Sequence, residues 1–197
     1  MKPGAFLFPE DTALIIVDVQ NDFCPGGALP VKYGDRIVPV INAWMPRFST
    51  IVASRDWHPP QSVHFEKWPV HCVAGSIGAA FHSCLDTARF TLVVDKGTGG
   101  MDDGYSAFEA TSVDLEGWLR QCGIGTLYIC GLATDYCVKQ TVLDALAKGF
   151  HTVLIADAIE AVDVRPGDGD AALATMLAAK PVPGFEIMHF CGEGVDN

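Results

Sequence analysis

Three side chains that could carry out covalent chemistry stand beside apolar segments. Cys137, in GLATDYCVKQ, lies between an apolar, β-branched segment and one with helical spacing of apolar residues. A helix N-terminus and a nearby cation lower the pKa of a thiol, and the backbone N–H groups there can bind an oxyanion. No histidine follows closely, so Asp18 is the candidate general base. Lys96 is the candidate partner of the thiolate and of a developing oxyanion, which completes an acid–amine–thiol group.

Each of these residues also has an ordinary structural interpretation. Cys137 could be a buried structural cysteine, Asp18 a capping or turn residue, and Lys96 a solvated lysine at a strand end. Asp22, close after Asp18 in VDVQNDF, is a second candidate for the base. The joint placement of the three residues at strand ends favours the catalytic interpretation.

A second group of polar residues has the chemistry of a metal site. Asp56 and His58, in SRDWHPP, are two residues apart, so an extended backbone points both side chains to one side. His71 follows in WPVHC. One carboxylate and two imidazoles suit a divalent metal with an open coordination position, which is the catalytic pattern. His64 ranks below these three, as a fourth ligand or as the group that orients a bound water.

The elements that must position these side chains are short apolar runs separated by helical patterns. The strands are expected at ALIIVD (13–18), TIVAS (50–54), TLVVDK (91–96), TLYICG (126–131), TVLIADA (152–158) and FEIMHF (185–190). Most runs are continuous rather than alternating, which is typical of strands buried on both faces of a parallel sheet. Helices are expected over residues 34–47, 115–122, 135–149 and 168–180.

Strands that alternate with helices predict an α/β protein with three layers, α/β/α, and a mostly parallel six-stranded sheet. Residues 1–197 are expected to form a single domain. Ligands of such sheets bind at the carboxyl ends of the strands, where Asp18, Asp56, Lys96 and Cys137 would meet. The long irregular stretch 55–90, rich in His, Pro, Trp and Gly, is of the kind that often carries function.

The composition limits the partners and the cellular compartment. The formal net charge of −11 argues against nucleic acid or an anionic membrane as the main partner. The seven cysteines contain no CxxC pair, so neither a disulfide framework nor a cysteine-rich zinc site is expected. The run ALIIV is too short for a signal core or a membrane span. We therefore expect a cytoplasmic protein.

Several longer segments closely resemble nicotinamidases of the isochorismatase-like cysteine hydrolase family. They are ALIIVDVQNDFCPGGAL, ASRDWHPP, WPVHCVAGSIGAAFH, VVDKGT, YSAF and GLATDYCVKQTVLDALAKGF. These segments follow the order of the family and run from about residue 13 to residue 158. VDVQNDF with GLATDYCV indicates the superfamily, and DWH with WPVHC indicates the nicotinamidase branch. The resemblance implies the isochorismatase-like hydrolase fold.

The resemblance also implies the catalytic roles. Asp18 would be the base, Lys96 its support, and Cys137 the nucleophile that forms a thioester. The oxyanion hole would consist of the backbone N–H groups of Ala133 and Cys137, shaped by a cis peptide bond between Leu132 and Ala133.

The same resemblance implies a metal that holds the substrate. Asp56, His58 and His71 would bind a divalent ion, commonly Zn²⁺, with Fe²⁺ or Mn²⁺ as alternatives. The ion would meet the pyridine nitrogen of nicotinamide. Three aromatic residues are expected around the ring: Phe23, Trp68 and Tyr105. The loop GTGGMDDGYSAF, which leads to Tyr105, departs from expectation in its many glycines and aspartates.

The implied activity is hydrolysis of nicotinamide to nicotinate and ammonia, a step of NAD salvage. One alternative is another amide or carbamoyl hydrolase of the same superfamily with an absent or vestigial metal site. A second is a non-catalytic binding protein, because a fold does not dictate a function. A homodimer is an expectation at the level of the family.

Overall fold

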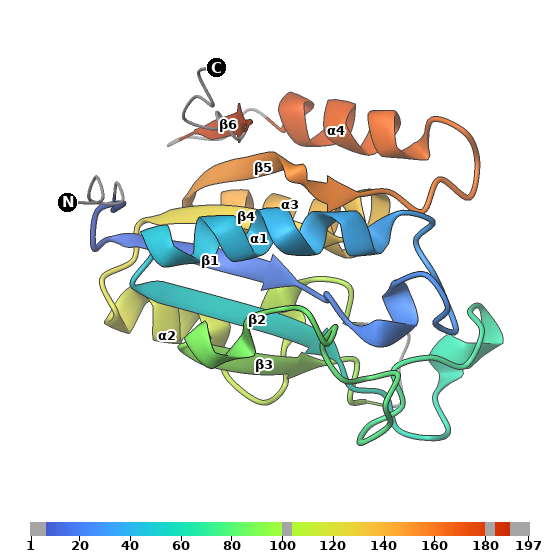
Figure 1. The fold of residues 1–197 in the computed structure, drawn as a ribbon. Coiled ribbons are helices and arrows are strands. Elements are labelled where there is room, and N and C mark those ends of the chain that lie inside the picture. The colour runs from blue at the N-terminus through green and yellow to red at the C-terminus, as the bar shows by residue number, and fades with distance from the viewer. Residues whose placement is uncertain (1–6, 100–103, 180–183, 190–197) are drawn as a thin grey trace, which may run out of the picture.

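The computed structural model describes residues 7–99, 104–179 and 184–189. They contain a six-stranded sheet in the order β3-β2-β1-β4-β5-β6 (Figure 1). The strands are β1 (Thr12–Val17), β2 (Thr50–Asp56), β3 (Leu92–Lys96), β4 (Thr126–Leu132), β5 (His151–Glu160) and β6 (Phe185–Met188). Every neighbouring pair of these strands runs parallel. All six predicted strands are confirmed, and the sheet, predicted to be mostly parallel, is parallel throughout the described residues.

The central strands are buried on both faces, as their continuous apolar runs predict. In β1, Leu14 and Ile16 belong to the hydrophobic core on one face of the sheet. Ala13, Ile15 and Val17 belong to the core on the opposite face. All five side chains are fully buried, so β1 can occupy only a central position.

Helices cover both faces of the sheet. They are α1 (Ile37–Trp44), α2 (Leu115–Gln121), α3 (Lys139–Ala147) and α4 (Asp168–Ala178). Residues of α1 belong to the core on one face, whereas residues of α2, α3 and α4 belong to the core on the other (Figure 1). The predicted three-layer α/β/α architecture is therefore confirmed.

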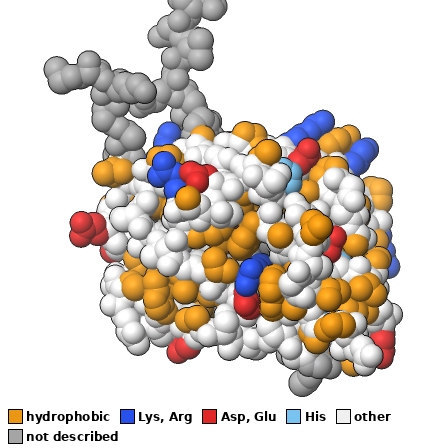
Figure 2. All heavy atoms as spheres, turned by 60° about the horizontal axis from the view of Figure 1, so that its bottom comes forward, with side chains coloured by type: hydrophobic (Ala, Val, Ile, Leu, Met, Phe, Trp, Pro, Cys, Tyr) orange, Lys and Arg blue, Asp and Glu red, His pale blue; other side chains and the backbone are white. Residues whose placement is uncertain are grey.

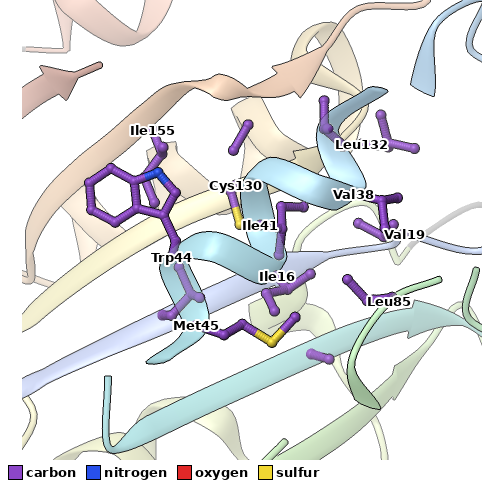
Figure 3. Packing of buried hydrophobic residues seen from close by; sticks show 14 of the residues in the cluster. Ile16, Val19, Val38, Ile41, Trp44, Met45, Leu85, Cys130, Leu132 and Ile155 are labelled. Atoms are coloured by element: carbon purple, nitrogen blue, oxygen red, sulfur yellow. The ribbon is translucent and has the colours of Figure 1, made fainter. Parts of the chain in front are cut away.

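Helix α1 shows how the sequence pattern becomes packing. Ile41 and Trp44 of α1, and Met45 directly after it, point toward the sheet, where Ile16 of β1 and Ile155 of β5 lie (Figure 3). The helix predicted over residues 34–47 consists of α1 flanked by single 3₁₀ turns, Gly34–Arg36 and Met45–Arg47. The α-helical part is thus shorter than the pattern predicts.

The strand order brings the carboxyl ends of the central strands together. The order reverses between β1 and β4, and ligands of open α/β sheets bind beside such a reversal. In the register, Val17 pairs with both Ser54 and Gly131, and Asp56 pairs with Lys96. The long connection between β2 and β3 lies beyond these strand ends and contains short 3₁₀ turns (Figure 1). These loops and strand ends enclose the candidate site.

Two further observations concern the surface. No helix in the described part of the chain is both long and apolar enough to cross a membrane. On the face shown in Figure 2, the basic side chains of the described residues stand in small separate groups among hydrophobic and acidic ones. The expectation that nucleic acid is not a partner stays a prediction.

Candidate active site

The ammonium group of Lys96 lies at the centre of the predicted catalytic residues. Its Nζ forms an ion pair with Asp18 Oδ2 at 2.8 Å, lies 3.5 Å from Cys137 Sγ and donates a hydrogen bond to the Gly104 carbonyl at 2.6 Å. It also contacts Asp56 Oδ1. Burial opposes the charged form, but Asp18 and Asp56 outweigh it and hold the pKa of Lys96 well above its usual value. The predicted acid, amine and thiol are thus in contact around a fixed cation.

Asp18 has the environment of a general base. Asp18 directly follows the last residue of β1, its backbone has φ +51°, and its side chain is fully buried. Ser54 Oγ donates a hydrogen bond of 2.8 Å to Asp18 Oδ1. Burial raises the pKa of Asp18 to about 6, against the opposing charge of Lys96. A base with a pKa near neutrality combines adequate basicity with a large ionised fraction at pH 7.

Cys137 lies in a short helical turn between β4 and α3. The turn spans Thr134–Val138 and is closed by a π-type hydrogen bond of 3.1 Å from the Val138 N–H to the Ala133 carbonyl. The residue that caps the N-terminus of the turn is Ala133. The peptide bond between Leu132 and Ala133 is cis, as the resemblance implies. Ala133 and Cys137 both line the pocket described below.

The pKa of the Cys137 thiol differs from the sequence-based expectation. The position at a helix N-terminus predicts a lowered value, but burial raises the pKa well above its usual value, and Lys96 offsets this only in part. Asp18 and Asp56 add to the rise. The thiol is therefore protonated at rest and needs a base within reach. Asp18, whose carboxylate contacts the same ammonium group as the thiol, is placed to serve as that base.

Three histidines and one carboxylate form the predicted metal site. Ligand atoms of His58, His64 and His71 all lie within 4.8 Å of one another. Asp56 Oδ2 lies 3.5 Å from His58 Nε2 and 3.9 Å from His71 Nε2. His64, which ranked below the others from the sequence, is placed with them by the 3₁₀ turn Val63–Glu66. Because the other oxygen of Asp56 contacts Lys96, this carboxylate belongs to both groups.

The histidines are oriented as metal ligands commonly are. His58 Nδ1 is 2.8 Å from the Gly97 carbonyl, and His71 Nδ1 is 2.7 Å from the Pro69 carbonyl. Such contacts fix the ring so that Nε2 faces the metal. Within the described residues, His58 Nε2 is buried without a hydrogen-bond partner, as expected for a nitrogen that binds an ion. Burial lowers the pKa of His71 and favours the neutral, ligating imidazole. The residues present therefore fit a divalent metal.

An apolar pocket lies between the two groups. The residues that line it are Phe23, Leu29, Asp56, His64, Trp68, His71, Gly104, Tyr105, Leu132, Ala133, Tyr136, Cys137 and Val162. All three predicted aromatic residues are among them. Trp68 Nε1 donates a hydrogen bond of 3.1 Å to the Tyr105 hydroxyl, and the Trp68 ring meets the Tyr136 ring edge-on.

The sequence did not predict Leu29, Gly104, Tyr136 or Val162 as residues of the pocket, and it indicated Leu132 only as a partner in the cis peptide bond. Tyr136 precedes Cys137, so its place in the segment GLATDYCV was the available signal. Leu29 and Val162 carry no such signal, because they reach the pocket only through the loops that follow β1 and β5. Asp22, the second candidate for the base, lies elsewhere: its carboxylate accepts hydrogen bonds from the backbone N–H groups of Ala28 and Cys72.

Comparison with known families supports the resemblance. The family model described as "Isochorismatase domain" matches residues 12–182. A nicotinamidase of Acinetobacter baylyi is 41% identical over 191 residues, which cover 85% of this chain and 89% of that protein.

Solved structures agree in fold and in identity. The pyrazinamidase of Pyrococcus horikoshii in complex with zinc matches with a TM-score of 0.82 and 41% identity, over 92% of this chain and 100% of that chain. PnC1 from L. infantum in complex with nicotinate matches with a TM-score of 0.83 and 35% identity, over 94% of this chain and 99% of that chain. With this sheet, this site and these relatives, the chain belongs to the isochorismatase family of hydrolases.

Proposed function

We propose that this chain is a nicotinamidase, which hydrolyses nicotinamide to nicotinate and ammonia. The observation that carries the proposal is the pocket, which brings a thiol with its base and a set of metal ligands to one apolar cavity lined by aromatic rings. Such a cavity suits a flat heteroaromatic ring with one polar atom at the metal and one carboxamide at the thiol. The relatives named nicotinamidase and the structure with nicotinate support this assignment.

The chemistry follows from the arrangement of the chain's own residues. Asp18 takes the proton of Cys137, and the thiolate attacks the carboxamide carbon. The backbone N–H groups of Ala133 and Cys137 bind the oxyanion. Asp18 returns the proton to the nitrogen, and ammonia leaves while a thioester forms. Asp18 then takes a proton from a water that attacks the thioester and passes it to the departing Cys137 sulfur. The free thiol is restored, and the nicotinic acid that is released ionises to nicotinate. Lys96 stays charged throughout and stabilises each anionic state.

The metal would contribute recognition. Asp56, His58 and His71, with His64 as a fourth ligand, would hold a divalent ion. When bound, the ion supplies a Lewis-acid position that accepts the pyridine nitrogen. We propose Zn²⁺, because the donors are imidazoles and a carboxylate and the P. horikoshii structure contains zinc, with Fe²⁺ and Mn²⁺ as alternatives. The apolar walls, with Phe23 among them, would hold the ring itself.

The test is an ammonia-release assay with nicotinamide, with metal analysis of the same sample. Rapid release with about one equivalent of metal per chain supports the proposal. The alternative, another amide or carbamoyl hydrolase of the superfamily, predicts turnover of other amides and little of nicotinamide. A chain that turns over no amide at all would be a binding protein.

Some expectations stand beside this function as proposals. The product would enter NAD salvage in the cytoplasm. The enzyme would act as a homodimer on a small-molecule substrate, with neither nucleic acid nor membrane as a partner. Residues 1–197 would form one domain.

A further inference from the structure

The segment Gln20–Asp22 contacts both loops that carry the metal ligands. We infer that Gln20 and Asp22 are positioning residues that set the affinity of the site for its metal. Gln20 holds the peptide groups of Asp56, and Asp22 holds the residue after His71. The inference deepens the proposed function and rests on it, because the metal site is part of that function.

Gln20 fixes the backbone on both sides of Asp56. Its side chain is fully buried. Nε2 donates hydrogen bonds of 2.8 Å to the carbonyls of Asp56 and Ala79, and Oε1 accepts one of 2.7 Å from the Asp56 N–H. Both donors and the acceptor of the amide are therefore engaged. Because Gln20 holds both the backbone N–H and the backbone carbonyl of Asp56, the Asp56 side chain extends from the strand end in a fixed direction.

Asp22 fixes the loop of His71. Its Oδ2 accepts a hydrogen bond of 2.7 Å from the N–H of Cys72, which follows His71 in an unusual conformation with φ +45°. The Cys72 carbonyl accepts a hydrogen bond of 3.0 Å from the His58 N–H. The residue Cys72 is thus held by Asp22 at its N–H and by a second metal ligand, His58, at its carbonyl. The separation of the two histidines depends on this residue.

Gly78 makes room for the Asp22 carboxylate. A Cβ atom at position 78 would lie 2.1 Å from Asp22 Oδ2, far inside van der Waals contact. The Gly78 carbonyl also accepts a hydrogen bond of 3.0 Å from the Asp22 N–H. The loop therefore leaves room for the Asp22 carboxylate only because residue 78 has no side chain. A side chain introduced at position 78 would displace this carboxylate without changing Asp22 itself.

The contacts of Asp22 are separate from those that support the thiol and its base. Among the described residues, the Asp22 carboxylate forms no hydrogen bond or ion pair with Asp18, Lys96 or Cys137. Its two oxygens accept hydrogen bonds from the backbone N–H groups of Ala28 and Cys72. The support of the thiol comes from Lys96. A change at Asp22 is therefore expected to weaken metal binding and to leave the reactivity of Cys137 in place.

The experiment measures Zn²⁺ affinity of the metal-free full chain by competition with a fluorescent chelator. Asp22→Asn retains the shape, but the new amide turns an N–H group toward one of the two backbone N–H donors. Gly78→Ala displaces the same carboxylate, and Gln20→Met removes the contacts to Asp56. Loss of partners behind metal ligands typically weakens metal affinity about 10- to 100-fold, which is the expected result for all three variants. Circular dichroism identifies the folded variants, and the independent routes leave the test intact if one variant fails to fold.

Asn21→Ala is the matched control. Asn21 lies between the two positioning residues, and its Nδ2 donates a hydrogen bond of 2.8 Å to Ile77 in the same loop, away from the ligands. We expect it to keep the Zn²⁺ affinity of the unsubstituted chain. Alkylation of Cys137 by iodoacetamide in metal-free Asp22→Asn is expected to proceed at the rate of the unsubstituted chain.

Four results would overturn the inference. They are unchanged Zn²⁺ affinity in the folded variants, an equal loss in Asn21→Ala, loss of Cys137 alkylation in Asp22→Asn, and no Zn²⁺ binding by the unsubstituted chain. None of these measurements uses nicotinamide. Failure to hydrolyse nicotinamide would thus refute the proposed function alone, whereas unchanged affinity in an active enzyme would refute the inference alone.

Discussion

Removal of the Ser54 hydroxyl should move the pH profile of the enzyme in a defined direction. Asp18 must be ionised to take the thiol proton, so kcat/KM should rise with pH through the pKa of Asp18, which is about 6. A group with that pKa is about nine tenths ionised at pH 7 and about one tenth ionised at pH 5. We therefore expect kcat/KM of the unsubstituted enzyme to fall about tenfold between pH 7 and pH 5.

The size of the shift in Ser54→Ala follows from one contact. Ser54 Oγ donates a 2.8 Å hydrogen bond to Asp18 Oδ1, and both side chains are fully buried. A hydrogen bond to a charged group contributes about 1.5–3 kcal/mol, against about 0.5–1.5 kcal/mol for a neutral pair. Its removal therefore costs the ionised form about 1–1.5 kcal/mol more than the protonated form, which raises the pKa by about one unit. The acid limb should move upward by that amount, while the plateau at high pH changes little.

The assay is kcat/KM for nicotinamide from pH 4.5 to 8.5 at a saturating metal concentration. The matched control is Thr152→Ala, which removes another buried hydroxyl; Thr152 lies on β5, and its partner is the carbonyl of Phe150, just before that strand. Its profile should coincide with that of the unsubstituted enzyme. An acid limb that stays in place in Ser54→Ala, or a loss of the same factor at every pH, would refute the assignment of Asp18 as the titrating base.

Three further predictions test the nucleophile, its base and the metal. Cys137→Ala should stay folded by circular dichroism and lose hydrolysis; a folded variant that keeps a substantial share of turnover would remove Cys137 from the mechanism. Asp18→Asn should lose hydrolysis, yet iodoacetamide should label its Cys137 at least as fast as in the unsubstituted enzyme, because the base is gone while the thiol loses one of the charges that raise its pKa; retained turnover, or slower labelling by mass spectrometry, would contradict this reasoning. Benzamide lacks the pyridine nitrogen, so its kcat/KM should be lower than that of nicotinamide by up to about 10⁴-fold, and the gap should shrink in His71→Ala; equal turnover of both amides would exclude coordination of the ring.

The parts of the fold that depend on local pattern could be predicted from the sequence. Six apolar runs became six strands because each is short, β-branched and bounded by polar or glycine-containing segments. Asp18, Asp56 and Lys96 could be placed together because polar residues that end parallel strands meet at one edge of a sheet. The short α-helical part of residues 34–47 was missed, because apolar spacing does not distinguish an α-helix from the 3₁₀ turns at its ends.

The remaining parts depend on contacts between distant segments. The thiol pKa of Cys137 was expected to be low from its helix terminus, but burial among Asp18 and Asp56 decides the direction. His64 ranked last among the ligands because its distance in sequence from His58 and His71 says nothing about the turn that carries it. The sequence also did not predict the hydrogen bonds of Gln20 and Asp22 beside the metal ligands. Their partners are backbone groups of residues far along the chain, and no local pattern indicates such contacts.

The position of Asp56 has a consequence for how this site can change over evolutionary time. One oxygen contacts Lys96 and the other faces the histidines. Substitution of a histidine removes one ligand and leaves the cation beside the thiol undisturbed. Substitution of Asp56 removes a ligand and also removes one of the two carboxylates, Asp18 and Asp56, that neutralise Lys96. A descendant enzyme that abandons the metal for a different substrate is therefore free to lose its histidines first, whereas the carboxylate must stay until another anion takes its place beside the lysine.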